Sequence, residues 1–171
     1  MEISAKNLVL AAAAAFAAVA AFCLLRSSEE SKVKAAFERA ADTISKKSDE
    51  SLIVAAAKSR SIADLADDKI SISFPEEGVV NARLARNEMA QQMTLVRNSC
   101  SSLSIAFESV KVVSIEGGTA HATADLLVSG SGSMSFLEGR DTREVEADLV
   151  KSPDDGKWRF SNVTVKPIVS L

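Results

Sequence analysis

An uninterrupted apolar run near the start is the strongest pattern along the chain. Residues 8–25 carry no charged side chain, and the run is bounded by Lys6 and Arg26. As a helix, about 18 residues span about 27 Å, close to the thickness of the hydrocarbon core of a bilayer. We therefore expect residues 1–28 to form a membrane anchor, whose larger apolar side chains are Leu8, Phe16, Val19, Phe22, Leu24 and Leu25.

Two other interpretations of this segment stay open. Val19-Ala20-Ala21 permits cleavage of a secretory signal, although Phe22 and the residues after it continue the apolar run. Lipidation of Cys23 requires a small residue before the cysteine, and Phe22 stands there. We expect a single-pass anchor with the following domain, residues 29–171, on the extracytoplasmic side. The alternative is a secreted form after cleavage.

The next part of the chain has helical spacing. Ser27 and Glu30 fit a capping box, and apolar residues then recur every three or four positions to about residue 46, at Val33, Phe37, Ala40, Ala41 and Ile44. Ser48 or Asp49 can cap a second helix over about 50–66. The apolar side of that helix is predicted to hold Leu52, Ile53, Ala56, Ala57, Ala63 and Leu65.

A strand and a longer helix follow. Residues 69–74 alternate apolar and polar side chains, which predicts a half-buried strand that ends before Pro75 and Gly78. A third helix is predicted over about 81–101, with its apolar face at Ala85, Met89, Met93, Val96 and Cys100. On that face Cys100 is expected to be a small buried side chain and not a reactive thiol.

The last third alternates as antiparallel strands do. Strands are predicted over 103–107 and 110–115 with a bulge at Glu108-Ser109, then over 119–128, 140–150 and 157–168. Gly117-Gly118 is predicted to form a tight turn. Residues 130–133 are predicted to form a flexible loop, and residues 153–156 a turn. The inward row of the strand 119–128 consists of Ala120, Ala122, Ala124 and Leu126, and the charged outer face is expected to hold His121, Asp125, Arg140, Arg143, Glu144, Glu146 and Asp148.

Composition narrows the chemistry that the domain can perform. The net charge is −3, without the basic surface that phosphate neutralisation requires, so nucleic acid is not an expected partner. With two cysteines, one histidine and no tyrosine, no catalytic, metal or cofactor site is assigned. The polar residues best placed to reach the mouth of a pocket are Asn98, Glu108, Arg140 and Trp158.

The order of these elements resembles the nuclear transport factor 2-like superfamily, the cone fold shared with ketosteroid isomerase and SnoaL-like proteins. The likeness rests on the third helix leading into Leu103-Ser104-Ile105, on Val110-Lys111-Val112 with residues 117–122, and on Leu149-Val150-Lys151 followed by residues 155–160. It implies an α+β domain in which three helices pack on a curved, mainly antiparallel sheet.

The resemblance does not carry over an activity. Enzymes of the superfamily use acids or bases inside the cone, whereas His121 and Asp125 are predicted to lie outside it. Superfamily members with one N-terminal span look like envelope assembly modules, which implies a second copy or an envelope protein on the sheet face. We therefore expect a membrane-anchored, non-catalytic domain that binds a partner or a small apolar ligand. The alternative is a small isomerase- or dehydratase-like enzyme acting on an apolar ligand in the cone.

Overall fold

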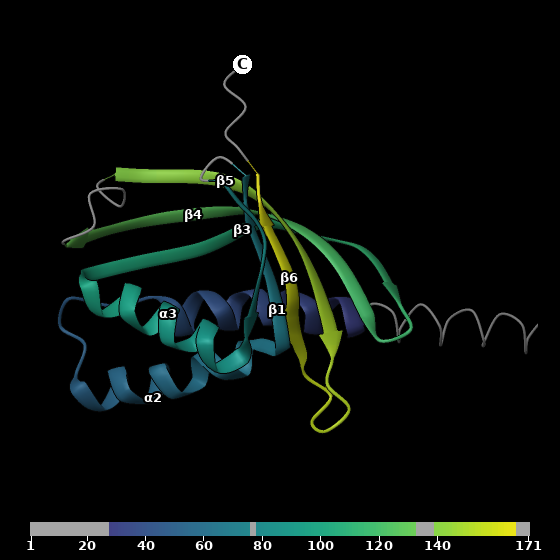
Figure 1. Cartoon of the computed structure of the whole chain (residues 1–171), viewed down its shortest axis with the longest axis horizontal. Coiled ribbons are helices and arrows are strands. Elements are labelled where there is room, and N and C mark those ends of the chain that lie inside the picture. The colour runs from purple at the N-terminus through teal and green to yellow at the C-terminus, as the bar shows by residue number, and fades with distance from the viewer. Residues whose placement is uncertain (1–27, 76–77, 133–138, 167–171) are drawn as a thin grey trace, which may run out of the picture.

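Three helices lie along one side of a curved six-stranded sheet (Figure 1). The computed structural model describes residues 28–75, 78–132 and 139–166. The predicted anchor over residues 8–25 lies outside these ranges. Within them, no helix combines the length and the apolar character that crossing a bilayer requires.

Most ends of the three helices lie close to the predicted positions. The first helix occupies residues 28–44. Of the face that the helical spacing predicted, Val33, Phe37 and Ala40 are almost fully buried, whereas Ala41 and Ile44 are half-buried. Ala36 is buried on the same face. The second helix, α2, covers Leu52–Ile62 and ends in a single 3-10 turn, Ala63–Leu65. The third, α3, covers Arg86–Ser99.

The sheet is mixed, and its strand order is β2-β1-β6-β5-β4-β3. The β1–β6 pair is parallel, and the other neighbouring pairs are antiparallel. The strands are β1 Ala66–Phe74, β2 Val79–Ala85, β3 Cys100–Glu116, β4 Thr119–Gly132, β5 Gly139–Lys151 and β6 Trp158–Val165. The α+β class and the helix-covered, curved sheet predicted from the sequence are therefore confirmed.

The predicted start of the third helix is wrong, because residues 81–85 are not helical. They belong to β2, which pairs with β1 through Ile70↔Leu84 and Ile72↔Ala82. Asn81 adopts a positive φ of 51°, and its backbone N–H donates to the Ser73 hydroxyl at 2.9 Å. This local bond, together with pairing to β1, holds the segment extended, so the helix begins only at Arg86.

The start of α2 also differs from the prediction. Ser51, and not Ser48 or Asp49, caps the helix, because its hydroxyl accepts the backbone N–H of Val54. The predicted apolar side of this helix is wrong over its first two turns, because Leu52 is 88% and Ile53 83% exposed, and Ala56 and Ala57 are exposed as well. The buried residue of this helix is Ile62.

Two predictions concern the long hairpin of β3 and β4, of which one is confirmed and the other is wrong. The bulge at Glu108-Ser109 is present, with Ser109 at a φ of 52° and a shift in pairing register at this point. The loop predicted at residues 130–133 is instead strand as far as Gly132, paired with the start of β3. Only glycine fits there, since a Cβ on Gly132 would lie 2.7 Å from the carbonyl oxygen of Ser99.

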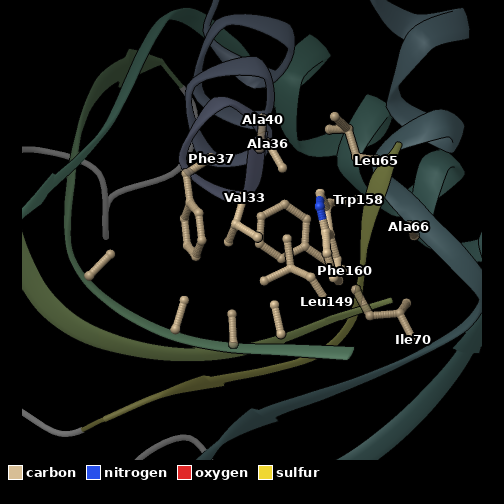
Figure 2. Packing of buried hydrophobic residues seen from close by; sticks show 14 of the residues in the cluster. Val33, Ala36, Phe37, Ala40, Leu65, Ala66, Ile70, Leu149, Trp158 and Phe160 are labelled. Carbon is tan, nitrogen blue, oxygen red and sulfur yellow. The ribbon is translucent and has the colours of Figure 1, made fainter. Parts of the chain in front are cut away.

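The core lies between the first helix and the concave face of the sheet (Figure 2). Ala120, Ala122 and Ala124 are buried in the same cluster as Phe37, as their alternation in β4 predicted. The Phe37 ring meets Phe107 and Phe160 edge to face, at centroid distances of 5.2 and 5.1 Å.

Candidate functional site

A cavity of about 190 Å³ lies inside the cone, beside the aromatic part of this core. The first helix contributes Phe37, Ala40 and Ile44 to its lining, and α3 contributes Met89 and Met93. The remaining lining side chains come from residues 65–74 and from β3 to β6, namely Leu65, Ala66, Ile70, Ile72, Phe74, Ile105, Phe107, Leu126, Val128, Val145, Phe160, Val163 and Val165. All of these side chains are apolar.

The periodicity of the chain explains how these residues meet. Ile70, Ile72 and Phe74 alternate along β1 and so point to one face of the sheet, as predicted. Met89 and Met93 are four residues apart on α3 and therefore lie one above the other. Because of these helix and strand periods, the apolar side chains point toward one common space.

The lining determines what the cavity can do chemically. General acid–base catalysis needs a titratable group within hydrogen-bond reach of the substrate, and no described lining residue carries one. A dry apolar cavity of about 150 Å³ is large enough to accept benzene or xenon. The cavity therefore suits one neutral, ring-sized molecule, held by dispersion and burial.

Three of the four residues predicted at a pocket mouth have described side chains, and none of the three lines this cavity. Asn98 on α3 and Glu108 on β3 are exposed, and Trp158 is buried in the core with 2% exposure. None of these three is among the lining residues. The side chain of Arg140 lies outside the described residues. Their role at a ligand site stays a prediction.

The prediction that Arg143 lies on the outer face of the sheet is wrong. It pairs directly with Leu126, which lines the cavity. Directly opposed residues of neighbouring strands point to the same face. Arg143 therefore lies on the concave face, half-buried, while Glu144 and Glu146 face outward.

A buried ion pair that the sequence analysis missed lies one helical turn beyond Met93. Arg97 is fully buried, and its guanidinium pairs with Glu50, whose side chain is 5% exposed. Arg97 also donates to the carbonyl of Ser45, next to the cavity residue Ile44. The four-residue spacing Met89, Met93, Arg97 was the available signal that this side chain points inward.

Lysines complete this cluster by binding the ends of helices. Lys58 donates to the carbonyls of Asp42 and Ser45, at 2.7 and 3.3 Å. Lys46 donates to the carbonyl of Cys100 at 2.7 Å. Cations are favourable at these positions because the last carbonyls of a helix have no partner within the helix. The cluster fixes α2 and α3 against the end of the first helix.

The outer face of the sheet carries a polar row. His121 Nδ1 lies 2.7 Å from Asp148 Oδ1, and the Asn162 amide donates to the other oxygen of Asp148 at 3.0 Å. The side chains of His121 and Asp148 are 39% and 36% exposed, in agreement with the predicted outward face. On the same face, hydrogen bonds to Glu144 and Glu146 raise the pKa of Lys166.

At the other end of the first helix, Glu29 binds three donors. Lys32, Lys151 and the indole of Trp158 reach its carboxylate at 2.8, 3.0 and 3.1 Å. The hydrogen bond from Lys32, with those from Lys151 and Trp158, lowers the pKa of Glu29 to about 2. This contact joins the first helix to the last strand.

Comparison with solved structures shows the fold. The Kfla4162 protein from Kribbella flavida superimposes with a TM-score of 0.65 at 16% identity, over 82% of this chain and 91% of that one. A nuclear transport factor 2-like superfamily protein from Salmonella enterica gives 0.62 at 13% identity, over 85% and 94%. A protein from Novosphingobium aromaticivorans named "putative scytalone dehydratase" gives 0.59 at 11% identity, over 86% and 87%.

These likenesses define the class of the fold, which is that of nuclear transport factor 2-like proteins. No protein-family model matches the sequence. No curated protein matches it either. The function must therefore be argued from the site itself.

Proposed function

We propose that this protein is a non-catalytic binding module that holds one small neutral apolar molecule in its cone. The observation that carries the proposal is the cavity of about 190 Å³ with an entirely apolar lining. Ligand pockets usually combine apolar walls with a few convergent polar groups that orient the ligand. A lining without such groups favours retention of a hydrocarbon-like molecule over its conversion.

The proposal includes tethering at a membrane by residues 8–25, on the extracytoplasmic side. The support is the length and apolar character of that run in the sequence. A second copy or an envelope protein on the outer sheet face stays part of the proposal, and the exposed row of His121 and Asp148 is the polar surface that such a partner would meet.

An enzyme acting on an apolar ligand is the second candidate. Its support is that proteins named "putative dehydratase" and "putative aromatic ring hydroxylase" share the fold, at TM-scores of 0.59 and 0.53. These names describe those proteins, whose identity to this chain is 14% in each case. We rank this candidate second, because no described lining residue carries an acid or a base.

The test is binding of benzene, read at the methyl groups of Met89 and Met93. The full chain is labelled with ¹³C-methyl methionine, and benzene is titrated while the methyl spectra are recorded. Because both side chains line the cavity, we expect saturable shifts of these two signals. A local readout separates occupation of the cavity from partitioning of benzene into lipid or detergent.

Two alanines of the first helix provide a matched pair of variants. Ala40→Leu adds three carbons into the cavity and is expected to abolish the shifts, whereas Ala35→Leu adds them on the exposed side of the same helix. Equal benzene responses in the two variants, or no response in the wild-type chain, would refute the proposed ligand class.

A further inference from the structure

Helix α2 is attached to the rest of the domain with very little apolar packing. Its last residue, Ile62, is buried, whereas residues 52–61 contribute no buried side chain to the core. The first helix, by contrast, buries side chains along most of its length. Because the burial of apolar surface supplies most of the free energy that holds an element in a fold, α2 is a weakly attached element.

The surface between α2 and α3 is polar as well. In Figure 1, α3 lies between α2 and the strands β3 to β5. A groove runs between the two helices, and most of its lining residues are polar or small, among them Ser59, Asn87, Gln91 and Thr94. The one large apolar side chain in the lining, Leu95, is 61% exposed. The groove therefore adds no apolar seam that would hold α2 against α3.

Two polar contacts fix the position of α2 instead. Just before the helix, Glu50 pairs with the buried guanidinium of Arg97 on α3. In the middle of the helix, Lys58 donates to the carbonyls of Asp42 and Ser45, at 2.7 and 3.3 Å. We call Glu50, Arg97 and Lys58 the polar latch. When α2 moves away, these charges regain their hydration, which offsets much of the attraction that they lose. The polar latch therefore opposes release of α2 less than apolar packing would.

The polar latch lies beside residues that line the cavity. The two carbonyls bound by Lys58 lie on either side of Ile44 in the chain, and Met93 is one helical turn before Arg97. Leu65, a third lining residue, belongs to the 3-10 turn that follows α2 directly. Release of α2 would consequently loosen the cavity lining at three points, on the first helix, on α3 and just before β1.

We infer that α2 undocks from the domain as a unit, and that a ligand in the cavity favours the docked state. The second part rests on the proposed function. A ligand makes its full contacts with Ile44, Leu65 and Met93 only while α2 holds these walls in place, so it binds the docked state more tightly. By linkage, occupation of the cavity reduces undocking by the same factor by which docking raises the affinity.

Hydrogen exchange of the full chain, measured by mass spectrometry, tests the undocking. A released helix of 11 residues is only marginally stable in water, so its backbone N–H groups become open to exchange together. We expect peptides from α2 to take up deuterium at least about ten-fold faster than peptides from β4. Equal rates would mean that α2 opens only when the whole domain unfolds, and would overturn the inference.

Two lysine variants test whether the polar latch controls this motion. Lys58→Met removes the contacts to the first helix and leaves the helix propensity similar, so we expect about ten-fold faster exchange in α2 and no change in β4. Lys34→Met makes the same substitution on the exposed side of the first helix and should change neither rate. An unchanged rate in the Lys58 variant, or the same acceleration in α2 and β4, overturns the inference.

Benzene tests the coupling to the cavity. With benzene at saturation, judged by the methyl signals of Met89 and Met93, exchange in α2 should slow several-fold in the wild-type chain. It should not change in Ala40→Leu, in which the added side chain occupies the cavity. Saturated methyl shifts without slower exchange overturn the coupling and leave the proposed function intact. An absence of methyl shifts refutes the proposed function and the coupling with it, whereas the Lys58→Met comparison decides separately whether α2 undocks.

Discussion

The indole nitrogen of Trp158 lies 3.1 Å from the carboxylate of Glu29, a residue 129 positions earlier in the chain. Arg39, farther along the same helix, donates to the backbone carbonyl of Trp158 at 2.8 Å. The first residue of β6 is thus fastened to the first helix at two points. The two contacts therefore hold the first helix, which begins at residue 28, against the start of β6.

Glu29→Gln is expected to remove a pH-dependent part of the stability. Hydrogen bonds and nearby lysines lower the pKa of Glu29 from 4.5 to about 2 in the folded chain. A group with a depressed folded pKa stabilises fully above its unfolded pKa, and this contribution disappears as the pH falls from about 4.5 to about 2. Because the side chain is 23% exposed, we expect a loss of only about 1–2 kcal/mol at pH 7.

The measurement is urea unfolding of both proteins between pH 7 and pH 2.5, followed by circular dichroism. The difference in the free energy of unfolding should shrink as the pH falls. A difference that stays constant over this range would contradict the role of the ionised carboxylate.

Trp158→Ala is expected to lower the free energy of unfolding by about 3–5 kcal/mol, since a large ring that is 2% exposed leaves a cavity. Trp158→Phe keeps most of the volume and removes the N–H donor, so it should cost clearly less. Thermal unfolding followed by circular dichroism measures both. A nearly neutral Trp158→Ala would show that β6 does not begin in the core.

The sequence could predict the elements in which one local period dominates. Alternation over Ala120, Ala122 and Ala124 identified the buried face of β4 correctly, and Glu108-Ser109 identified the bulge in β3. β2 was missed because Ala85 continues the four-residue spacing of Met89 and Met93. Its extended form depends on pairing with β1 and on the bond between Asn81 and Ser73, which no helical pattern reveals.

The candidate site was harder to predict, because its polar and apolar parts depend on contacts between distant residues. Arg97 can be buried only because Glu50, 47 positions away, compensates its charge. The pocket-mouth residues were chosen for polarity, whereas the cavity is apolar and its lining comes from every layer of the fold. Arg143 was grouped with its charged neighbours, although alternation with Val145 places it on the concave face.

Arg97→Met should be strongly destabilising, because it leaves the Glu50 carboxylate buried without its main partner. Breaking a buried pair from one side typically costs about 3 kcal/mol or more. Arg86→Met is the matched control on the same helix, since Arg86 pairs with Asp68 at 2.7 Å but Asp68 is 89% exposed. That exposed pair should contribute about 0–1 kcal/mol. Urea unfolding monitored by Trp158 fluorescence compares them, and similar losses would disprove the role of burial.

Cys100 should resist maleimide while the chain is folded. Its side chain is 2% exposed at the start of β3, and a buried thiol cannot meet the reagent. In a Cys23→Ala chain, mass spectrometry should show labelling only in denaturant. Rapid labelling under native conditions would mean that this end of β3 opens readily.

His121 and Leu149 test the two faces of the sheet against each other. His121→Ala removes a half-exposed side chain and one contact with Asp148, so we expect a change of about 1 kcal/mol or less. Leu149 on the adjacent strand β5 is fully buried, and Leu149→Ala should cost about 2–5 kcal/mol because it leaves a cavity in the core. Urea unfolding of the two variants gives both values under one condition. If the histidine variant lost as much stability as the leucine variant, the outward face of β4 would have to be packed against another part of the protein or a second copy.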